Sequence, residues 1–161
     1  MFREMRRKKQ LMSIEDAKAV LERGKSGVLA VAGDDDYPYA VPVSYIYYDS
    51  KIFFHCAKSG HKLDAIERQS KVSFCVIDKD QIVPEEYTTY FRSVICFGKA
   101  RVFHDETEKR KAIEKLAEKY SPKQVEGRKT EIEKEFKLFH MVEIEVDHMT
   151  GKEAIELVKK Q

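Results

Sequence analysis

A short basic segment around a single glycine separates two apolar stretches of the chain. The segment Lys58-Ser59-Gly60-His61-Lys62 follows the strand-like stretch FFHCA and precedes the helix-like stretch LDAI. A phosphate group is held by backbone N–H groups at the start of a helix and by cations close by. This segment has both features, and Gly60 leaves room for close approach to the backbone. A solvated basic turn would give the same pattern, so the segment alone leaves both interpretations open.

His55 lies just before this segment, among apolar residues. A histidine in such a place is either a packed core residue or a group that holds a proton in catalysis. No other catalytic pattern accompanies it, because the sequence has no HExxH motif, no GxxxxGK[ST] loop and no Ser/His/Asp spacing. The remaining candidates His104, His140 and His148 are scattered and predict no metal site.

The stretch YPYAVPVSYIYY alternates large and small side chains with the period of a strand. Its small or rigid positions are Pro38, Ala40, Pro42 and Ser44. Because a proline in mid-strand cannot donate to a ladder, we expect Pro42 at a sheet edge, at a bulge or where no strand lies alongside. A flat ligand could lie against this small, partly unpaired stretch, and an edge strand protected by proline is the alternative interpretation.

Length, charge and cysteine use limit the class of protein. A chain of 161 residues predicts one domain, 1–161, with a basic N-terminal arm over 1–12 and a C-terminal tail over 153–161. The net charge of +2 gives no reason to expect nucleic-acid or membrane-surface binding. The arm lacks the apolar stretch of a signal peptide, and no segment approaches the ~18 apolar residues of a membrane span. These features predict a cytoplasmic protein.

The cysteines support the same compartment. Cys56, Cys75 and Cys96 each lie inside an apolar run, and no two of them have CxxC spacing. We therefore expect buried free thiols in a reducing environment rather than a disulfide framework or a zinc site.

Helix and strand patterns predict a mainly β protein with flanking helices. Ser13 is a typical N-cap for a helix that ends at Gly24. Short turns at 34–36 and 49–50 join the first three strands, which favours an antiparallel meander. Six strands with helices between some of them predict an antiparallel barrel, closed or nearly closed. The expected strands are GVLAVAG, YPYAVPVSYIYY, KIFFHCA, KVSFCVID, RSVICFGKARVFH and HMVEIEVDHM.

The segments between these strands are predicted as follows. LDAIERQ forms a short helix, and a loop of about a dozen residues surrounds Pro84. A charged helix runs from Glu106 to Tyr120 with one apolar face, and Ser121-Pro122 ends it. A polar connection or a second short helix leads to the last strand.

In this order, several segments resemble the FMN-binding split-barrel superfamily. They are PYAVPVSYIYY, FFHCAKSGHKLDAI, YFRSVICFGKARVF and the closing MTGKE. Within the superfamily they are similar to the pyridoxamine 5'-phosphate oxidase-related group, which includes the nitroimidazole resistance (Nim) proteins. The resemblance extends over about residues 13–153. It implies a six-stranded antiparallel split barrel that binds FMN at the interface of a homodimer.

The resemblance also implies which residues meet the cofactor. The flavin ring would lie along Val41, Pro42, Val43 and Ser44. The serine-arginine-lysine triplet that holds the flavin phosphate matches Gly60-His61-Lys62, so Lys62 is kept and His61 replaces the arginine. His55 and Cys56 fall where the family approaches the ring and ribityl chain. Further positions expected at the cofactor are Ala57, Lys58 and Ser93, the last of which matches a glutamine.

The strand RSVICFGKARVFH adds a reason to expect a dimer. Its first half is apolar on both faces, so both faces should be covered, and a barrel interior can cover only one. A twofold partner on the other face would place Ser93 of one chain beside the flavin of its mate.

By function, the resemblance favours an FMN-dependent oxidoreductase. Electrons would pass from a reduced nicotinamide or similar donor to a small acceptor such as a nitroaromatic, and His55 is the candidate proton donor. The chain has no tryptophan and ends in KEAIELVKKQ, whereas true pyridoxamine phosphate oxidases end in a segment with arginine and tryptophan that grips their substrate. We therefore do not expect oxidation of pyridoxamine phosphate.

Three alternatives to this function stay open. The chain could be a non-catalytic flavin-binding or flavin-sensing module, which the lack of a recognisable substrate-gripping motif favours. It could instead be a split barrel that binds haem or a deazaflavin. The least favoured alternative is an RNA-binding barrel, because the sequence has no basic stripe interleaved with aromatic residues.

Overall fold

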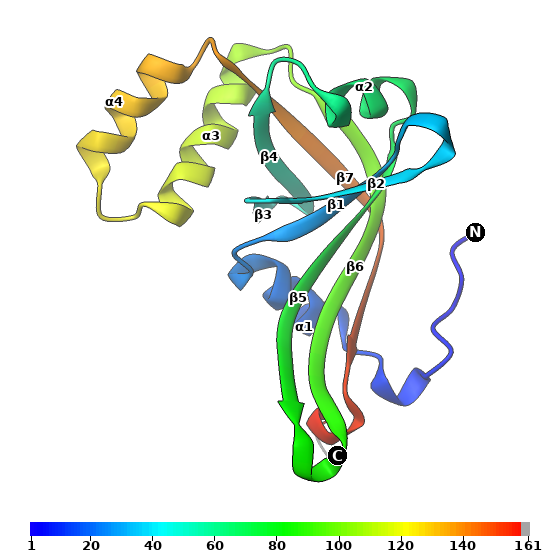
Figure 1. The fold of residues 1–161 in the computed structure, drawn as a ribbon. Coiled ribbons are helices and arrows are strands. Elements are labelled where there is room, and N and C mark those ends of the chain that lie inside the picture. The colour runs from blue at the N-terminus through cyan, green and yellow to red at the C-terminus, as the bar shows by residue number, and fades with distance from the viewer. Residues whose placement is uncertain (159–161) are drawn as a thin grey trace.

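The computed structural model describes residues 1–158, which form one antiparallel sheet of seven strands with helices around it (Figure 1). The strands are β1 (Gly27–Ala32), β2 (Pro38–Val43), β3 (Ile46–Tyr48), β4 (Lys51–Ala57), β5 (Lys71–Val83), β6 (Thr88–Val102) and β7 (Phe139–Glu153). Their order in the sheet is β2-β1-β5-β6-β7-β4-β3. The predicted mainly β architecture is confirmed. Over the described residues β2 and β3 are the two edges, so the sheet is not closed.

The number of strands differs from the prediction because one expected strand is two. YPYAVPVSYIYY divides into β2 and β3 at Ser44 and Tyr45. β2 pairs only with β1, with Pro42 opposite Val28, and β3 pairs only with β4. Pro42 therefore lies on an edge strand, as its missing N–H group predicts.

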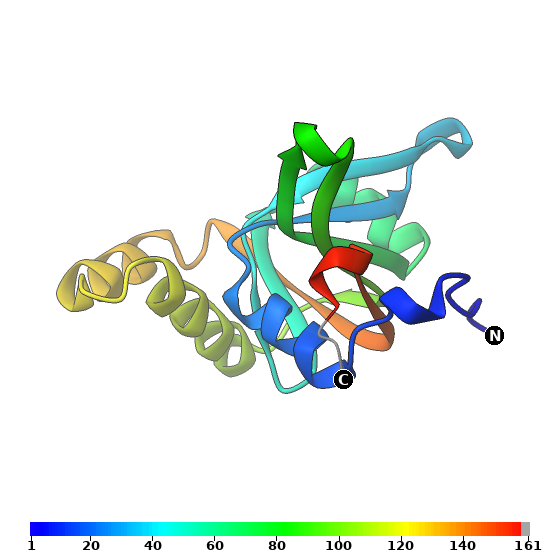
Figure 2. The same cartoon turned by 90° about the horizontal axis from the view of Figure 1, so that it is seen from below.

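The four α-helices are α1 (Ile14–Arg23), α2 (His61–Arg68), α3 (Glu106–Tyr120) and α4 (Val125–Glu135). The predicted cap of α1 is confirmed, because the N–H group of Asp16 donates to Ser13 Oγ at 3.1 Å. α3 has the predicted bounds and begins with a similar cap at Asp105. α4 is the second short helix left open above. Seen from below, α3 and α4 project away from the sheet (Figure 2). Short 3₁₀ segments lie at Lys8–Gln10, Asp34–Asp36, Pro84–Glu86 and Ile155–Leu157.

The predicted loop around Pro84 was wrong, because β5 and β6 continue through it as a long hairpin. Beyond a bulge between Ile77 and Lys79 the two strands pair until Val83 opposite Thr88. The polar residues that suggested a loop belong to a ribbon exposed on both faces. Asp78 lies where this ribbon leaves the sheet. The Asp78 carboxylate accepts from Arg23 at 2.7 Å and from Arg92 at 3.1 Å, which ties the ribbon to α1 and to β6.

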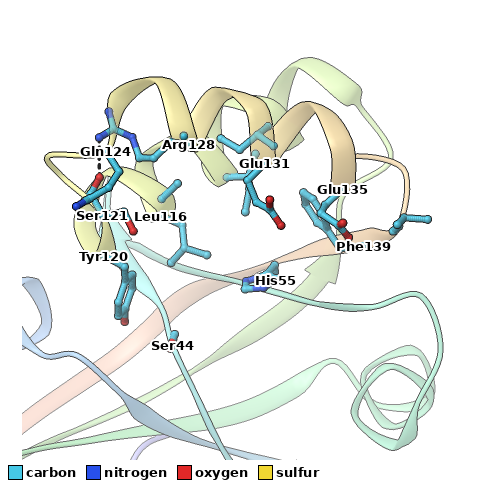
Figure 3. A pocket seen from close by; sticks show the side chains of 15 residues that line it. Ser44, His55, Leu116, Tyr120, Ser121, Gln124, Arg128, Glu131, Glu135 and Phe139 are labelled. Carbon is cyan, nitrogen blue, oxygen red and sulfur yellow. Dashed lines mark hydrogen bonds between the residues drawn. The ribbon is translucent and has the colours of Figure 1, made fainter.

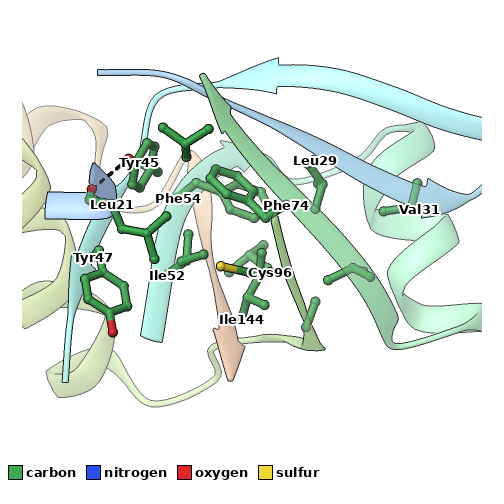
Figure 4. Close-up of a cluster of buried hydrophobic side chains, with 14 of the residues drawn as sticks. Leu21, Leu29, Val31, Tyr45, Tyr47, Ile52, Phe54, Phe74, Cys96 and Ile144 are labelled. Carbon is green, nitrogen blue, oxygen red and sulfur yellow. Dashed lines mark hydrogen bonds between the residues drawn. The ribbon is translucent and has the colours of Figure 1, made fainter. Parts of the chain in front are cut away.

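Buried side chains of the described residues form two clusters. The larger lies between the sheet and the helices α1 and α2. In it Tyr45, Phe54 and Phe74 are fully buried, and Tyr45 Oη donates to the Leu21 carbonyl at 2.7 Å (Figure 4). The smaller lies between β4, β7 and the two helices α3 and α4. Its buried members are Phe53, Phe103, Ala112, Ile113, Leu116, Ile132, Phe136, Phe139 and Met141.

The two ends of the described chain lie against the sheet. Phe2 of the basic arm stacks on His148 with ring centroids 4.6 Å apart and on Phe97 at 5.5 Å. Met12 donates its N–H group to the Gly151 carbonyl at 2.9 Å. The expected tail begins with the last residue of β7 and a 3₁₀ turn, and its final part, 159–161, lies outside the described residues.

Cys56 and Cys96 are buried and Cys75 is half-buried, and all three are free thiols, as predicted. Burial raises the pKa of Cys96 to about 12 and also raises that of Cys75. At pH 8 we expect Cys96 to react with an aromatic disulfide reagent only on unfolding, because the thiolate is the reactive form. The absorbance of the released thiolate measures this. A reaction of the folded protein that is lost in Cys96→Ser would contradict the expectation.

Candidate functional site

The basic segment forms the tight start of α2 that the sequence predicts. Gly60 has φ 146°, a conformation that favours glycine, and the N–H group of Asp64 donates to its carbonyl at 3.2 Å. A side chain at Gly60 would meet no atom within 4 Å, so the space beside this turn is open. Lys58 is exposed, and Lys62 is half-buried in the first turn of α2.

His55 and Cys56 point to opposite faces of β4, as neighbours on a strand do. Cys56 is buried in the larger cluster, so only its backbone is available to a ligand outside the sheet. His55 faces outward, with its ring centroid 5.8 Å from that of Phe139. Burial, with a smaller contribution from the charge of Lys62, lowers the pKa of His55. The imidazole is therefore mostly neutral at pH 7, and the nearby charge that acts on it is that of Lys62 in the first turn of α2.

His61 lies against the start of β2. Its ring stacks on Tyr39 with centroids 4.1 Å apart, and its Nε2 is 3.8 Å from Asp34 Oδ2. Arg68, at the other end of α2, donates to the same carboxylate at 3.2 Å. Asp34 thus ties α2 to the turn before β2. Sequence reasoning treated Asp34 only as a turn residue, and nothing in the sequence indicated this contact.

The outer face of the sheet carries two rows of small or apolar residues. Strand register defines one row as Pro42, Val28, Cys75, Ile95 and Thr150, and the next as Ala40, Ala30, Ser73, Phe97 and His148. Phe2 covers part of Phe97 and His148, yet Ile95 is 42% exposed and Phe97 40% exposed, so this face lacks most of the cover that the apolar pattern of the strand predicts. We call these two rows the outer face.

Ser93 lies far from the other predicted site residues within one chain. His55 pairs with Met141 of β7, and Ser93 pairs with Lys152 of the same strand. Lys152 lies eleven positions after Met141, which corresponds to about 35 Å along β7. One chain does not bring Ser93 to His55.

A cleft of about 690 Å³ opens beside His55 and Ser44, between the sheet and the helices α3 and α4 (Figure 3). Its wall on α3 is apolar apart from Tyr120, and its wall on α4 carries polar groups. Sequence reasoning missed this second wall, because the connection after α3 gave no sign that it folds back over His55. The lining residues are Ser44, His55, Ile113, Leu116, Ala117, Tyr120, Ser121, Gln124, Gly127, Arg128, Glu131, Ile132, Glu135, Leu138 and Phe139.

Two consecutive side chains at the end of α3 hold the break between β2 and β3. The N–H group of Tyr45 donates to Tyr120 Oη at 3.0 Å, and its carbonyl accepts from Lys119 Nζ at 2.9 Å. Lys119 Nζ also donates to the Gly24 carbonyl and lies 4.1 Å from the Tyr45 ring centroid. We call Lys119 and Tyr120 the clasp. It satisfies buried backbone groups that no ladder reaches and so fixes Ser44 at the cleft.

Replacing Lys119 with methionine is expected to lower the free energy of unfolding by about 1–3 kcal/mol. The Gly24 carbonyl loses this donor, and the Tyr45 carbonyl keeps only the 3.2 Å hydrogen bond from Tyr120 Oη. Urea titration measures the change. Lys115→Met is the matched control, since Lys115 lies over the Tyr48 ring at 4.9 Å without bridging two loops, and its cost should be smaller. Equal costs would mean that the clasp adds nothing beyond ring contact.

Two further properties of residues 1–158 limit the kinds of site. Their histidine, cysteine and acidic side chains form no group that could hold a metal ion. None of their helices has both the length and the apolar character needed to cross a membrane.

Comparison with known proteins adds the family. The family model described as pyridoxamine 5'-phosphate oxidase matches residues 13–153. A search of curated proteins finds no match. Among solved structures, a conserved hypothetical protein from Mycobacterium tuberculosis has a TM-score of 0.81 at 18% identity, over 98% of this chain and 96% of that one.

Two other similar structures have more informative descriptions. A protein assigned to 5-nitroimidazole antibiotic resistance in Bacteroides thetaiotaomicron has a TM-score of 0.72 at 19% identity, over 88% of this chain and 85% of that one. A FAD- and haem-binding protein from Mycobacterium smegmatis has a TM-score of 0.74 at 19% identity, over 95% and 77%. At such identities these structures show the shared fold alone. The family model extends over most of the chain, and the protein therefore belongs to the pyridoxamine 5'-phosphate oxidase family of split-barrel proteins.

Proposed function

We propose that the protein is a flavin-dependent oxidoreductase that binds FMN. The observation that carries the proposal is the combination of three features: the open, basic start of α2, the edge strand β2 with its small residues, and the cleft that Ser44 and His55 both line. The solved structure from Mycobacterium smegmatis binds FAD and haem, which supports a planar redox cofactor on this fold.

The residues present fit an FMN molecule. A phosphate would lie at the N–H groups that begin α2, with Lys62 and then Lys58 neutralising its charge. The left-handed conformation of Gly60 and the empty space beside it leave that approach open. The ring would lie along the backbone of Val41, Pro42, Val43 and Ser44, toward the cleft. When bound, the flavin supplies the hydride and electron chemistry, and the chain binds it, orients it and excludes water.

The homodimer is part of the proposal. The residues of the outer face are exposed or half-buried, and they form a continuous, mostly uncharged surface over five strands, which is the composition of an interface centre. Ser93 lies on the same strand as Ile95 and Phe97. A twofold partner on the outer face would bring its own Ser93 toward this chain's site, which a single chain leaves without that residue.

The physiological reaction proposed is transfer of electrons from a reduced nicotinamide to a small acceptor such as a nitroaromatic. The apolar wall of the cleft, with Leu116 and Phe139, supports an aromatic acceptor. The free thiols fit a reducing compartment, and we propose a cytoplasmic location.

The test is the colour of the purified full-length protein and its response to a reductant. Flavin absorption that bleaches on anaerobic addition of NADH or NADPH is the expected result. A flavin spectrum that neither nucleotide bleaches would favour a binding or sensing module. A Soret band or a deazaflavin spectrum would replace FMN in the proposal.

If His55 donates a proton to the acceptor, the rate of acceptor reduction should fall as pH rises. The protonated imidazole is the acid, and its pKa lies below the ordinary 6.5, so the rate should drop about tenfold per unit above that value. Steady-state reduction between pH 5 and 8, with flavin content held constant, measures the profile. His55→Gln should be slow and independent of pH. A profile that His55→Gln leaves unchanged would remove His55 from the chemistry.

A further inference from the structure

The wall of the cleft formed by α4 is built unlike an ordinary exposed helix face. Gly127, Glu131 and Glu135 follow one another along the side of α4 that lines the cleft. In Figure 3 the carboxylates of Glu131 and Glu135 point from α4 toward the side where His55 lies. The opposite wall is apolar, with Leu116 and Phe139 among its residues. The cleft thus has one apolar wall and one wall, on α4, that carries carboxylates.

Gly127 has no structural reason to be a glycine. Its backbone is helical, and a Cβ atom there would approach only the Cβ of Gln124, at an ordinary 3.8 Å. Alanine would stabilise the helix better at this position. The missing side chain therefore leaves space in the cleft that no part of the protein fills, which points to a ligand against α4.

The charges around the cleft favour one kind of ligand. Within residues 1–158 Glu131 has no ion-pair partner, and Glu135 lies 3.7 Å from the exposed Lys134. The one cation of the lining, Arg128, is held at the far end, where Nη1 donates to the carbonyls of Ser121 at 2.7 Å and Pro122 at 2.8 Å. His55, facing from β4, adds no charge at pH 7. Outside the lining, the charge of Lys62 acts on His55, and Lys109 Nζ lies 4.4 Å from the Phe139 ring centroid. The acidic character of the cleft therefore belongs to its wall on α4.

We propose that this cleft binds a flat aromatic molecule that is uncharged or cationic, with Gly127 leaving room for its ring and Glu131 and Glu135 excluding anions. This inference rests on the proposed function in one respect, which is that the bound molecule would be the electron acceptor of the flavin. The space, the apolar wall and the carboxylates belong to the chain itself.

The charge selection is tested with three probes that share one ring: 4-nitrobenzylamine, 4-nitrobenzyl alcohol and 4-nitrobenzoate. Equilibrium dialysis of the full-length protein as purified, at neutral pH, gives their affinities. The ammonium probe should bind at least about fivefold more tightly than the benzoate. This ratio should shrink in Glu131→Gln and in Glu135→Gln. It should persist in Glu133→Gln, the matched control, whose carboxylate pairs with Arg110 at 2.5 Å instead of lining the cleft.

The space is tested with Gly127→Ala, and Lys129→Ala on the same helix is its control. Gly127→Ala should melt at the same or a higher temperature while it binds the uncharged alcohol at least about fivefold more weakly, since a methyl group fills the ring's place. Lys129→Ala should leave that affinity unchanged.

Equal binding of the three probes, or the absence of any binding, would overturn the proposal. So would unchanged alcohol affinity in Gly127→Ala. The flavin absorbance of each preparation separates the two proposals. A preparation without flavin that still shows the charge preference would contradict the proposed function alone, and a flavin-loaded protein without the preference would contradict only the cleft.

Discussion

Ile95→Asp is expected to separate the dimer into monomers and to remove the flavin in the same step. The side chain of Ile95 is 42% exposed in one chain and lies in the row of the outer face that also contains Cys75. A carboxylate there would be desolvated without a partner at the centre of the proposed interface, which costs several kcal/mol. Loss of the partner would also withdraw its Ser93 from the site.

Light scattering and flavin absorbance on the same sample test this expectation. Ile14→Asp is the matched control, because Ile14 is 48% exposed on α1 instead of on the sheet, and it should stay dimeric and coloured. The wild-type interface should bury well over ~2,000 Å². A clean Ile95→Asp monomer that binds FMN stoichiometrically would overturn both the dimer and the shared site.

Lys62→Ala is expected to weaken FMN binding by about 1.5–3 kcal/mol, the range for a hydrogen bond to a charged group, which is roughly 10- to 150-fold in Kd. Lys62 is half-buried in the first turn of α2, where a phosphate would meet the helix start. Quenching of flavin fluorescence on titration measures the affinity. Lys58→Ala should cost less, because the exposed Lys58 is more readily replaced by water.

Riboflavin, which has the same ring but no phosphate, provides the control for this prediction. Its affinity should be the same for Lys62→Ala and the unaltered protein. If FMN and riboflavin lost affinity equally, Lys62 would support the fold of the site and not hold the phosphate. If neither changed, the phosphate would lie elsewhere.

The parts of the structure that follow from local chemistry could be predicted from the sequence. Ser13 caps α1 because its hydroxyl accepts from the N–H group of Asp16, which has no acceptor within the first turn of the helix. Gly60 marks the turn before α2 because only glycine adopts its φ readily. The edge position of Pro42 follows from its missing donor. Each of these depends on neighbours in the chain.

The parts that depend on distant segments could not be predicted in this way. β2 ends at Val43 because Tyr45, two residues later, turns its N–H and carbonyl groups to the clasp. Tyr120 of the clasp lies 75 positions away in the chain. The polar ribbon after Asp78 is a strand pair because Arg23 and Arg92 both donate to the Asp78 carboxylate where the ribbon begins. The wall of the cleft on α4 appears only once α3 has fixed where the chain turns back.

Helix α4 buries little of its surface against the rest of the molecule, so its sequence can vary with little effect on the fold. It packs on α3 and has Ile132 as its buried residue, while the sheet, the start of α2 and the outer face are all built from other segments. A library that randomises the cleft side of α4 and keeps Ile132 would therefore vary ligand choice with little risk to folding. In an evolving lineage the same arrangement would let acceptor preference drift rapidly while cofactor binding and assembly stayed under separate selection.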